Sequence, residues 1–232
     1  MDPGDWVDLY PLLNSYKFYL NEAFFNSPAM ALPNQGLGAA AVYNFVSNFY
    51  VSGGIHDANG EPTNFIFDNI DSFFTQKEYF TWIEAGYKKT STDYTDGNSV
   101  HLTYWHQDAR SEKDLEESYG WSFSASKVFP KGITTFLRAD ISNGNAPVLH
   151  HIIATGVTLK PWKHDILGFG FNWGGPSDRS KRDQYGLEVF YALQLTQNLN
   201  IMPDIQFTIN PSFNTDKNLI GVYSVIRLRY AM

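Results

Sequence analysis

Residues 184–213 read QYGLEVFYALQLTQNLNIMPDIQFTINPSF and decide the fold of this chain. Every second position from Tyr185 to Leu195 is aliphatic or aromatic, and after the short turn TQN the alternation resumes from Leu199 to Ile209. Since side chains alternate between the two faces of a strand, the stretch predicts a β-hairpin with one apolar and one polar face. A soluble sandwich would turn the apolar face inward, whereas a membrane barrel would turn it outward.

The same period of two recurs along most of the chain. About eleven such segments are bounded by Gly, Pro, Asn and Asp, and most have the length of about ten residues that a tilted barrel strand needs to cross a bilayer. The predicted strands are 36–46, 49–57, 79–89, 98–108, 119–129, 132–141, 151–160, 165–174, 183–196, 199–210 and 219–232. No long helix is predicted, and residues 65–76 suggest only a short helical turn.

Composition narrows the class of protein. The chain has 232 residues, a net charge of −7 and an aromatic share of 16%, and it contains no cysteine. The acidic balance argues against nucleic acid as a partner, and the absence of cysteine removes disulfides and thiolate metal sites. Mean hydropathy is −0.30, and the apolar runs are too short for a membrane-spanning helix, but alternating barrel strands also average to near-neutral hydropathy.

Two features orient the apolar face outward. With TSTDYTDG as a partial exception, short turns alternate with longer, charged connections. Outer-membrane barrels show the same difference between tight periplasmic turns and long extracellular loops. In the last predicted strand, Arg227 and Arg229 share the face opposite the apolar one. Two arginines facing a dry core would be costly, whereas they cost little beside a watery lumen. The sequence therefore predicts an all-β fold, an antiparallel transmembrane β-barrel of the outer-membrane porin type.

Segments spread over almost the whole chain resemble the carbohydrate-selective porins of the OprB type. They are NEAFFNSPAMALPNQGLGAAAVY, FYVSGGIHDANG, FDNIDSFFTQKEYFTWIEAGY, HLTYWHQDAR, YGWSFSASKVFP, FLRADISNGNAP, DILGFGFNWGGPSD and DQYGLEVFYALQLTQNLNIMPDIQFTINPSFN. The resemblance implies an outer-membrane barrel of about sixteen strands and a diffusion channel for sugars and other small solutes. The chain departs from such barrels in ending at Met232, where they usually end in an aromatic residue.

Residues 1–232 are expected to form a single porin domain, with residues 1–35 as an extended or loop segment before the first clear strand. The opening MDPGDWVDLY is not a signal peptide and resembles an internal part of the family, so amino-terminal strands and a signal peptide are expected to be missing. The chain would then be a partial barrel of 11–12 strands. The alternative is that Tyr16–Phe25 supplies a twelfth strand and the barrel closes.

Strand phase places nine side chains toward the lumen as candidates for lining it and contacting solute. They are Glu84, His101, Trp105, Arg138, Asp140, Glu188, Asp204, Arg227 and Arg229. Acids and bases in a channel set a transverse field and hydrogen-bond passing hydroxyls, and Trp105 would offer a stacking surface. A generic charge ladder that only holds the strands in register is the alternative. The small residues opposite the apolar faces suggest a wide channel.

Neither catalytic residues, nor a metal, nor a cofactor is predicted, because no His/Ser/Asp set clusters by strand phase and no glycine-rich phosphate loop appears. The stretch HDANGEP at 56–62 weakly resembles the start of a calcium loop, but a plain Asn-Gly turn is favoured. His150 and His151 are predicted to point to opposite faces of a strand. Whether the long loop 57–78 enters the lumen is left open.

The expected partners are sugars or other small polar solutes, outer-membrane lipid and lipopolysaccharide, and the barrel assembly machinery. The expected location is the outer membrane of a Gram-negative type cell; the oligomeric state stays open. Two alternatives remain. One is a soluble β-sandwich that binds or cleaves polysaccharide, with a carboxylate pair such as Glu188 and Asp204. The other is a closed twelve-stranded outer-membrane enzyme, which would need a nucleophile and a histidine on its outer wall.

Overall fold

A computed structural model describes residues 18–45, 48–63, 66–89, 98–213 and 219–230. Its strands are β1 (Gly38–Asn44), β2 (Phe49–Asp57), β3 (Tyr79–Lys88), β4 (Ser99–Gln107), β5 (Ser118–Phe129), β6 (Ile133–Asn143), β7 (Leu149–Leu159), β8 (Ile166–Pro176), β9 (Gln184–Gln194), β10 (Leu199–Ile209) and β11 (Ile220–Tyr230). The helices are α1 (Glu22–Phe25) and α2 (Ile66–Thr75), with single 3₁₀ turns at Ser111–Lys113 and Pro130–Gly132. Each predicted strand is confirmed, with shifts of a few residues at its ends.

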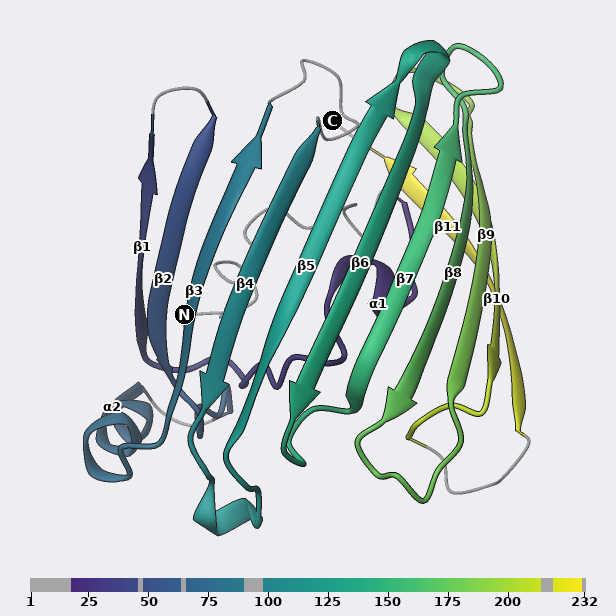
Figure 1. The fold of residues 1–232 in the computed structure, drawn as a ribbon. Helices are drawn as coiled ribbons and strands as arrows, with labels where there is room; N and C mark the ends of the chain where they lie inside the picture. The colour runs from purple at the N-terminus through teal and green to yellow at the C-terminus, as the bar shows by residue number, and fades with distance from the viewer. Residues whose placement is uncertain (1–17, 46–47, 64–65, 90–97, 214–218, 231–232) are drawn as a thin grey trace.

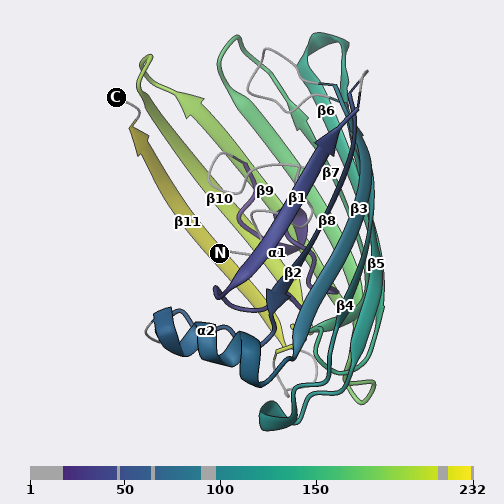
Figure 2. The ribbon, with the colours of Figure 1, turned by 90° about the vertical axis from the view of Figure 1, so that its left-hand side faces the viewer.

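All eleven strands form one antiparallel sheet in which each strand pairs with its neighbours in the sequence. The predicted hairpin of β9 and β10 is confirmed, and its apolar residues lie opposite one another, with Ile205 opposite Val189 and Phe207 opposite Leu187. Figures 1 and 2 show the sheet curling around α1 and the chain next to it. A sandwich requires two packed sheets, so the alternative of a soluble β-sandwich is wrong.

The sheet is not closed by the described residues, because no pairing joins β1 to β11 among them. Residues Glu22–Phe25 form α1 rather than part of a twelfth strand. The other end of that predicted strand, Tyr16 and Lys17, lies outside the described residues, as does Met232. No helix in the described ranges combines the length and apolar character needed to cross a bilayer.

The two rims of the sheet differ in their connections (Figure 1). The short-turn rim carries 45–48, 130–132, 160–165 and 195–198, together with the β3–β4 connection, whose residues 90–97 lie outside the described part of the chain. The long-loop rim carries 58–78 with α2, then 108–117, 144–148, 177–183 and 210–219. The predicted sorting of loops holds at most connections, with two exceptions. The connection 144–148 is as short as the turns opposite, and the β3–β4 connection, residues 89–98, is as long as 108–117. Figure 2 shows α2 at this rim, beyond the strand ends, and Phe65 just before it is not described.

One local prediction is wrong. The register between β7 and β8 shifts between Leu149 and His151, which marks a β-bulge. A bulge breaks the strict alternation of side chains along a strand. The rings of His150 and His151 therefore do not point to opposite faces but lie close together, with their centroids 5.8 Å apart. His151 also packs edge-on against Trp173, at 5.0 Å.

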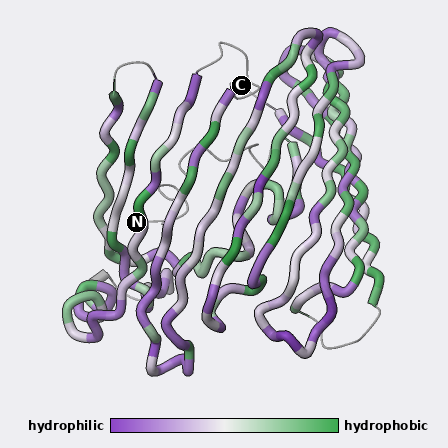
Figure 3. The backbone as a smooth tube through the Cα atoms, in the orientation of Figure 1, coloured by the Kyte–Doolittle hydropathy of each residue, from purple (hydrophilic) through white to green (hydrophobic). Residues whose placement is uncertain are grey.

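The orientation of the sheet is confirmed. Ser122, Ser124 and Ser126 of β5 are buried on the concave face, while Trp121, directly before Ser122, is 49% exposed. Large apolar side chains project from the convex face on nearly every strand. They include Ile83, Leu102, Leu137, Ile153, Phe169, Leu187, Phe207 and Ile226. Figure 3 shows hydrophobic and hydrophilic positions alternating along the strands, with hydrophilic residues gathered in the connections of the long-loop rim. This is the inside-out pattern of a membrane barrel.

Candidate functional site: the occupied lumen

The concave face is occupied by a segment of the chain itself. Residues 18–32, here called the inner segment, contain α1, and α1 contacts β7 and β8. Figures 1 and 2 both place this segment inside the curve of the sheet. Phe18, Tyr19 and Phe24 are almost completely buried although they precede the first strand. The polar wall that the sequence predicts to face open water is therefore partly covered.

Aromatic packing holds the first half of the inner segment. The Tyr19 ring meets Phe190 of β9 edge-on at 5.0 Å and Phe136 of β6 at 5.5 Å. The Phe24 ring lies tilted against Tyr19, with ring centroids 4.9 Å apart. Ala154, Ala192 and Met202 complete this buried cluster. Fully burying an aromatic side chain of this size contributes about 1.5–3 kcal/mol, so three such rings are a strong anchor.

The small lumen-facing residues of β8 have a packing role that the sequence argument missed. A Cβ on Gly170 would lie 2.7 Å from Phe24 Cζ, and one on Gly168 would lie 2.1 Å from Phe190 Cε1. These glycines therefore leave room for aromatic rings. The prediction that the small residues line a wide channel is therefore wrong for this part of the wall.

Hydrogen bonds fix the backbone of the inner segment to the wall. The Glu188 carboxylate accepts the N–H groups of Leu20 at 2.6 Å and Asn21 at 2.7 Å. The Tyr19 hydroxyl lies within hydrogen-bonding distance of the carbonyl oxygens of Val157 and Phe169, at 3.0 and 2.8 Å. Each contact joins parts of the chain more than a hundred positions apart, so the segment is tied to several strands at once.

A charged pair supports the same region. Arg227 Nη2 donates to the carbonyl oxygen of Phe18 at 2.6 Å and to Asp204 Oδ2 at 2.9 Å. The guanidinium also lies over the Phe190 ring, 5.9 Å from its centroid. Asp204 is 2% exposed, and a carboxylate so deeply buried depends on a cation beside it. Arg227 therefore both balances Asp204 and holds the start of the inner segment.

Two further anchors lie along the second half of the inner segment. The Ser27 hydroxyl donates to Asp140 Oδ2 at 2.6 Å. Met30 and Ala31 pack in a buried cluster with Phe80, Trp82 and Trp105. The Trp105 indole stacks on Phe80, with centroids 6.0 Å apart, and is 1% exposed. Its aromatic surface is thus covered by protein rather than turned to the lumen.

The remaining candidate side chains lie on the concave face in different settings. Buried Glu84 accepts hydrogen bonds from Tyr50 and Thr103, at 2.6 and 2.5 Å. Arg138 is buried and donates to Ser124, and its Nε lies 3.8 Å from Asp140 Oδ2. His101 is 2% exposed, whereas Arg229 is exposed near the end of β11.

The structure therefore brings together Glu188, Asp204 and Arg227 at the start of the inner segment, and Arg138 with Asp140 beside Ser27. Glu84 belongs to a separate network between β2, β3 and β4. Contact of any of the nine with a solute stays a prediction. The inner segment itself was missed, and three aromatics in Phe18–Phe24 outside any strand were the available signal.

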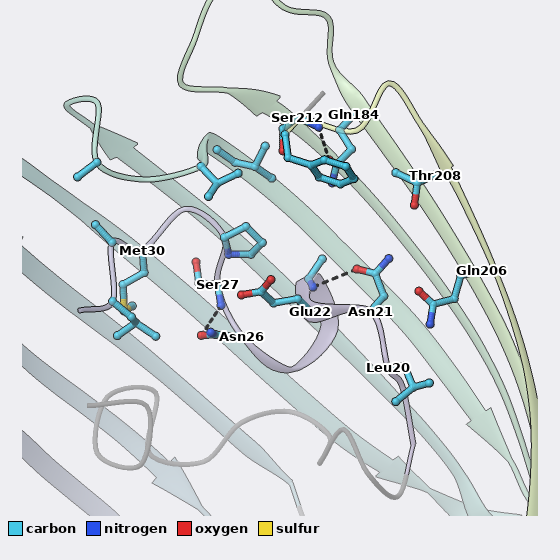
Figure 4. Close-up of a pocket in the computed structure, with 18 of the residues that line it drawn as sticks. Leu20, Asn21, Glu22, Asn26, Ser27, Met30, Gln184, Gln206, Thr208 and Ser212 are labelled. Carbon is cyan, nitrogen blue, oxygen red and sulfur yellow. Dashed lines mark hydrogen bonds between the residues drawn. The ribbon is translucent and has the colours of Figure 1, made fainter. Parts of the chain in front are cut away.

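An open pocket remains between the inner segment and the wall near the long-loop rim (Figure 4). Its volume is about 520 Å³, within the usual range for small-molecule sites. Polar side chains from the inner segment, β9 and β10 meet here, including Asn21, Glu22, Asn26, Gln184 and Thr208. Phe213 and Tyr223 add aromatic surface.

Connections at the long-loop rim are tied together by Glu78. Its carboxylate accepts Asn59 Nδ2 at 2.6 Å and the Ser111 hydroxyl at 2.9 Å. Arg110 beside it donates to the carbonyl oxygen of Ala58 at 2.8 Å. Partial burial opposes ionisation of Glu78, but these hydrogen bonds and the charge of Arg110 outweigh it and hold its pKa below the ordinary value.

The stretch 56–62 forms a turn, as favoured from its sequence. Asp57 Oδ1 accepts the N–H of Asn59 at 2.9 Å, which is an Asx turn. Within the described part of the chain, no group of three or more His, Asp or Glu side chains is arranged to hold a metal ion.

Comparison with known proteins gives two matches. The family described as carbohydrate-selective porin, OprB family, matches residues 18–228. A solved structure of Pseudomonas putida OprB at high pH is similar to this fold with a TM-score of 0.63 and 14% sequence identity. The match covers 89% of this chain and 60% of that chain, so this chain spans about three fifths of its length. No curated protein gives a significant match.

Proposed function

The chain belongs to the carbohydrate-selective porin, OprB family, and on this premise we propose that it forms a passive outer-membrane channel for sugars or other small polar solutes. The observation that carries the proposal is the division of the wall into an apolar convex face and a polar concave face. Only the convex face suits contact with lipid, because a lipid-facing charge costs several kcal/mol. The concave face is then the boundary of an aqueous path.

The chemistry of the concave face fits uncharged polar solutes. Its open pocket offers amide and hydroxyl groups beside Phe213 and Tyr223, and a sugar presents hydroxyls at its edge and C–H groups on its face. Amides and hydroxyls both donate and accept hydrogen bonds, so they can exchange with the water that a solute carries. The inner segment supports size selection, since it occupies part of the section through which solute would pass.

We propose that transport proceeds without catalysis. An outer-membrane enzyme would need a nucleophile beside a histidine on the convex face. His106 lies on that face by strand phase, with Nε2 2.8 Å from Glu117 and Nδ1 3.8 Å from Asp108. His151, also on the convex face, packs edge-on against Trp173. Within the described residues no hydrogen bond joins either ring to a serine or threonine, as an activated nucleophile would require.

The proposed partners follow from the location. The convex face would contact outer-membrane lipid and lipopolysaccharide, and the strands would be inserted by the barrel assembly machinery. The nine concave-face residues named from the sequence are proposed to act mainly in shaping the lumen, with direct solute contact expected where side chains stay open, as at Arg229.

The test is reconstitution of the protein in planar bilayers and in liposomes. Stepwise conductance that falls on addition of maltooligosaccharides, together with liposome swelling in glucose, would support the proposal. A folded, heat-modifiable barrel that conducts no ions and passes no sugar would contradict it. If the protein conducts ions but oligosaccharides do not reduce the conductance, the channel function would stand and the proposed class of solute would be wrong.

A further inference from the structure

The pocket of about 520 Å³ lies between the inner segment and several parts of the wall. The inner segment supplies one side through α1 and the residues that follow it. The wall supplies the other through the ends of β9 and β10 with Ser212 and Phe213 after them (Figure 4). Ala146 and Val148 between β6 and β7, Leu149 at the start of β7, and Tyr223 of β11 complete the lining. Gln184 Oε1 accepts the N–H of Ser212 at 2.8 Å, which closes the wall at the rim. A solute that enters from the long-loop rim meets this pocket before the buried clusters beneath it.

Of the described residues that line the pocket, Glu22 alone carries a charge. The others are amides, hydroxyls and apolar side chains. Glu22 is exposed, and no hydrogen bond of its carboxylate is found within the described ranges. Figure 4 shows this side chain projecting from α1 among the lining residues.

The position of Glu22 is fixed from both sides. Before it, the backbone N–H groups of Leu20 and Asn21 are bound by Glu188. Within α1, the Asn21 side chain accepts the N–H of Ala23 at 3.1 Å. After it, Ser27 is bound to Asp140. These contacts hold the backbone of Glu22 beside the pocket, so its side chain projects from a fixed point of the inner segment.

The nearby charges of the wall are already balanced or covered. Glu188 is fully buried under the inner segment, Asp140 is bound by two serine hydroxyls, and Asp204 pairs with Arg227. Lys181 lies outside the lining and donates to the carbonyl oxygen of Ser212 at 2.7 Å. Among the residues that line the pocket, the charge that a solute meets is therefore the Glu22 carboxylate. In a narrow space where the solute sheds part of its hydration, such a charge acts more strongly than in bulk water.

We propose that Glu22 sets the charge preference of this channel by disfavouring anionic solutes, such as sugar acids and phosphorylated sugars, relative to neutral ones. The inference rests on the proposed channel function and adds a selection rule to it. Repulsion raises the barrier for an anion that passes the pocket, whereas a neutral sugar uses the amide and hydroxyl groups and is little affected.

The experiment measures the reversal potential of the reconstituted protein under a potassium chloride gradient, together with the relative uptake of glucose and gluconate into liposomes. Glu22→Gln keeps the size of the side chain and removes its charge. We expect a roughly two- to fivefold fall in the K⁺/Cl⁻ permeability ratio and a rise in gluconate uptake relative to glucose. The matched control is Glu116→Gln, which removes an exposed carboxylate from the same rim outside the pocket lining.

A second variant tests the pocket independently of Glu22. Asn26 lines the same pocket, and its Oδ1 accepts the N–H of Ser27, a contact that aspartate can keep. Asn26→Asp should raise the K⁺/Cl⁻ ratio above the wild-type value and should restore it when combined with Glu22→Gln. A conducting channel whose ratio is the same in Glu22→Gln and Glu116→Gln overturns this inference alone. A folded wild-type barrel without conductance overturns the channel function and this inference with it.

Discussion

The Glu188 carboxylate accepts a hydrogen bond from the backbone N–H of Leu20 at 2.6 Å, across 168 positions of the chain. The same carboxylate also accepts a hydrogen bond from the backbone N–H of Asn21 at 2.7 Å, so both of its oxygens are bound. A lumen-facing acid that strand phase presents as a solute contact thus serves as an acceptor for the chain itself. The wall and the inner segment therefore form one hydrogen-bonded unit.

Removing the Glu188 carboxylate should loosen the inner segment while the barrel wall remains folded. In Glu188→Ala both backbone donors lose their partner, and hydrogen bonds to a charged group are worth about 1.5–3 kcal/mol. We expect the exchange protection of the Leu20 and Asn21 amides to fall by roughly ten- to a hundredfold. Hydrogen exchange read by mass spectrometry measures this. Glu188→Gln keeps one acceptor oxygen and should fall between the two, whereas equal protection in all three proteins would contradict the anchoring role.

Arg227→Ala should destabilise the barrel strongly, because it leaves the buried Asp204 carboxylate without its cation. Breaking a buried ion pair from one side costs about 3–5 kcal/mol. The midpoint of the heat-modifiable transition on gels, or the free energy of unfolding in urea, measures the loss. Arg229→Ala is the matched control, two positions along the same strand and exposed, and should change stability by less than about 0.5 kcal/mol. Similar effects of the two substitutions would refute the pairing.

Leu137→Arg should show whether the convex face meets lipid. Leu137 lies near the middle of β6 and is 42% exposed, and an arginine at the bilayer midplane costs about 2–4 kcal/mol. Ile141→Arg, nearer the long-loop rim on the same face, should cost less because the penalty falls toward the interface. Unfolding in lipid vesicles measures both free energies. Equal and small costs would indicate that water, not lipid, covers this face.

The Glu78 network should depend on pH. Its pKa in the folded protein lies below the ordinary value of 4.5, so its contribution is complete at neutral pH and is lost as the pH falls below 4.5 through the folded pKa. We expect the Ser111 amide, which donates to Glu78, to lose protection in that range after correction for intrinsic exchange. In Glu78→Gln this pH dependence should be absent. A wild-type protein with the same protection at pH 3 and pH 7 would contradict the assignment.

Strand positions could be predicted because each strand carries its own signal. In β9 and β10 the alternation of apolar and polar residues predicts the face on which each side chain lies. The observed pairing of the two strands places apolar residues opposite apolar residues, in agreement with that prediction. The outward direction of the apolar face also followed from Arg227 and Arg229, because burial of two arginines in a dry core is costly. The exception at His150 and His151 arises from a bulge, which has no reliable signature in a single sequence.

The eleven strands, their order and the outward side of the sheet could be predicted from the sequence, because they depend on local periodicity and on neighbours in the chain. The tertiary structure alone decided what fills the concave face. Tyr19 reaches Phe136 and Phe190, and Leu20 reaches Glu188, only once strands far apart in the chain are side by side. The periodicity of a strand predicts the face on which a side chain lies, but not the residue that it contacts. The position of the inner segment and its pocket therefore depends on the curvature of the sheet around them.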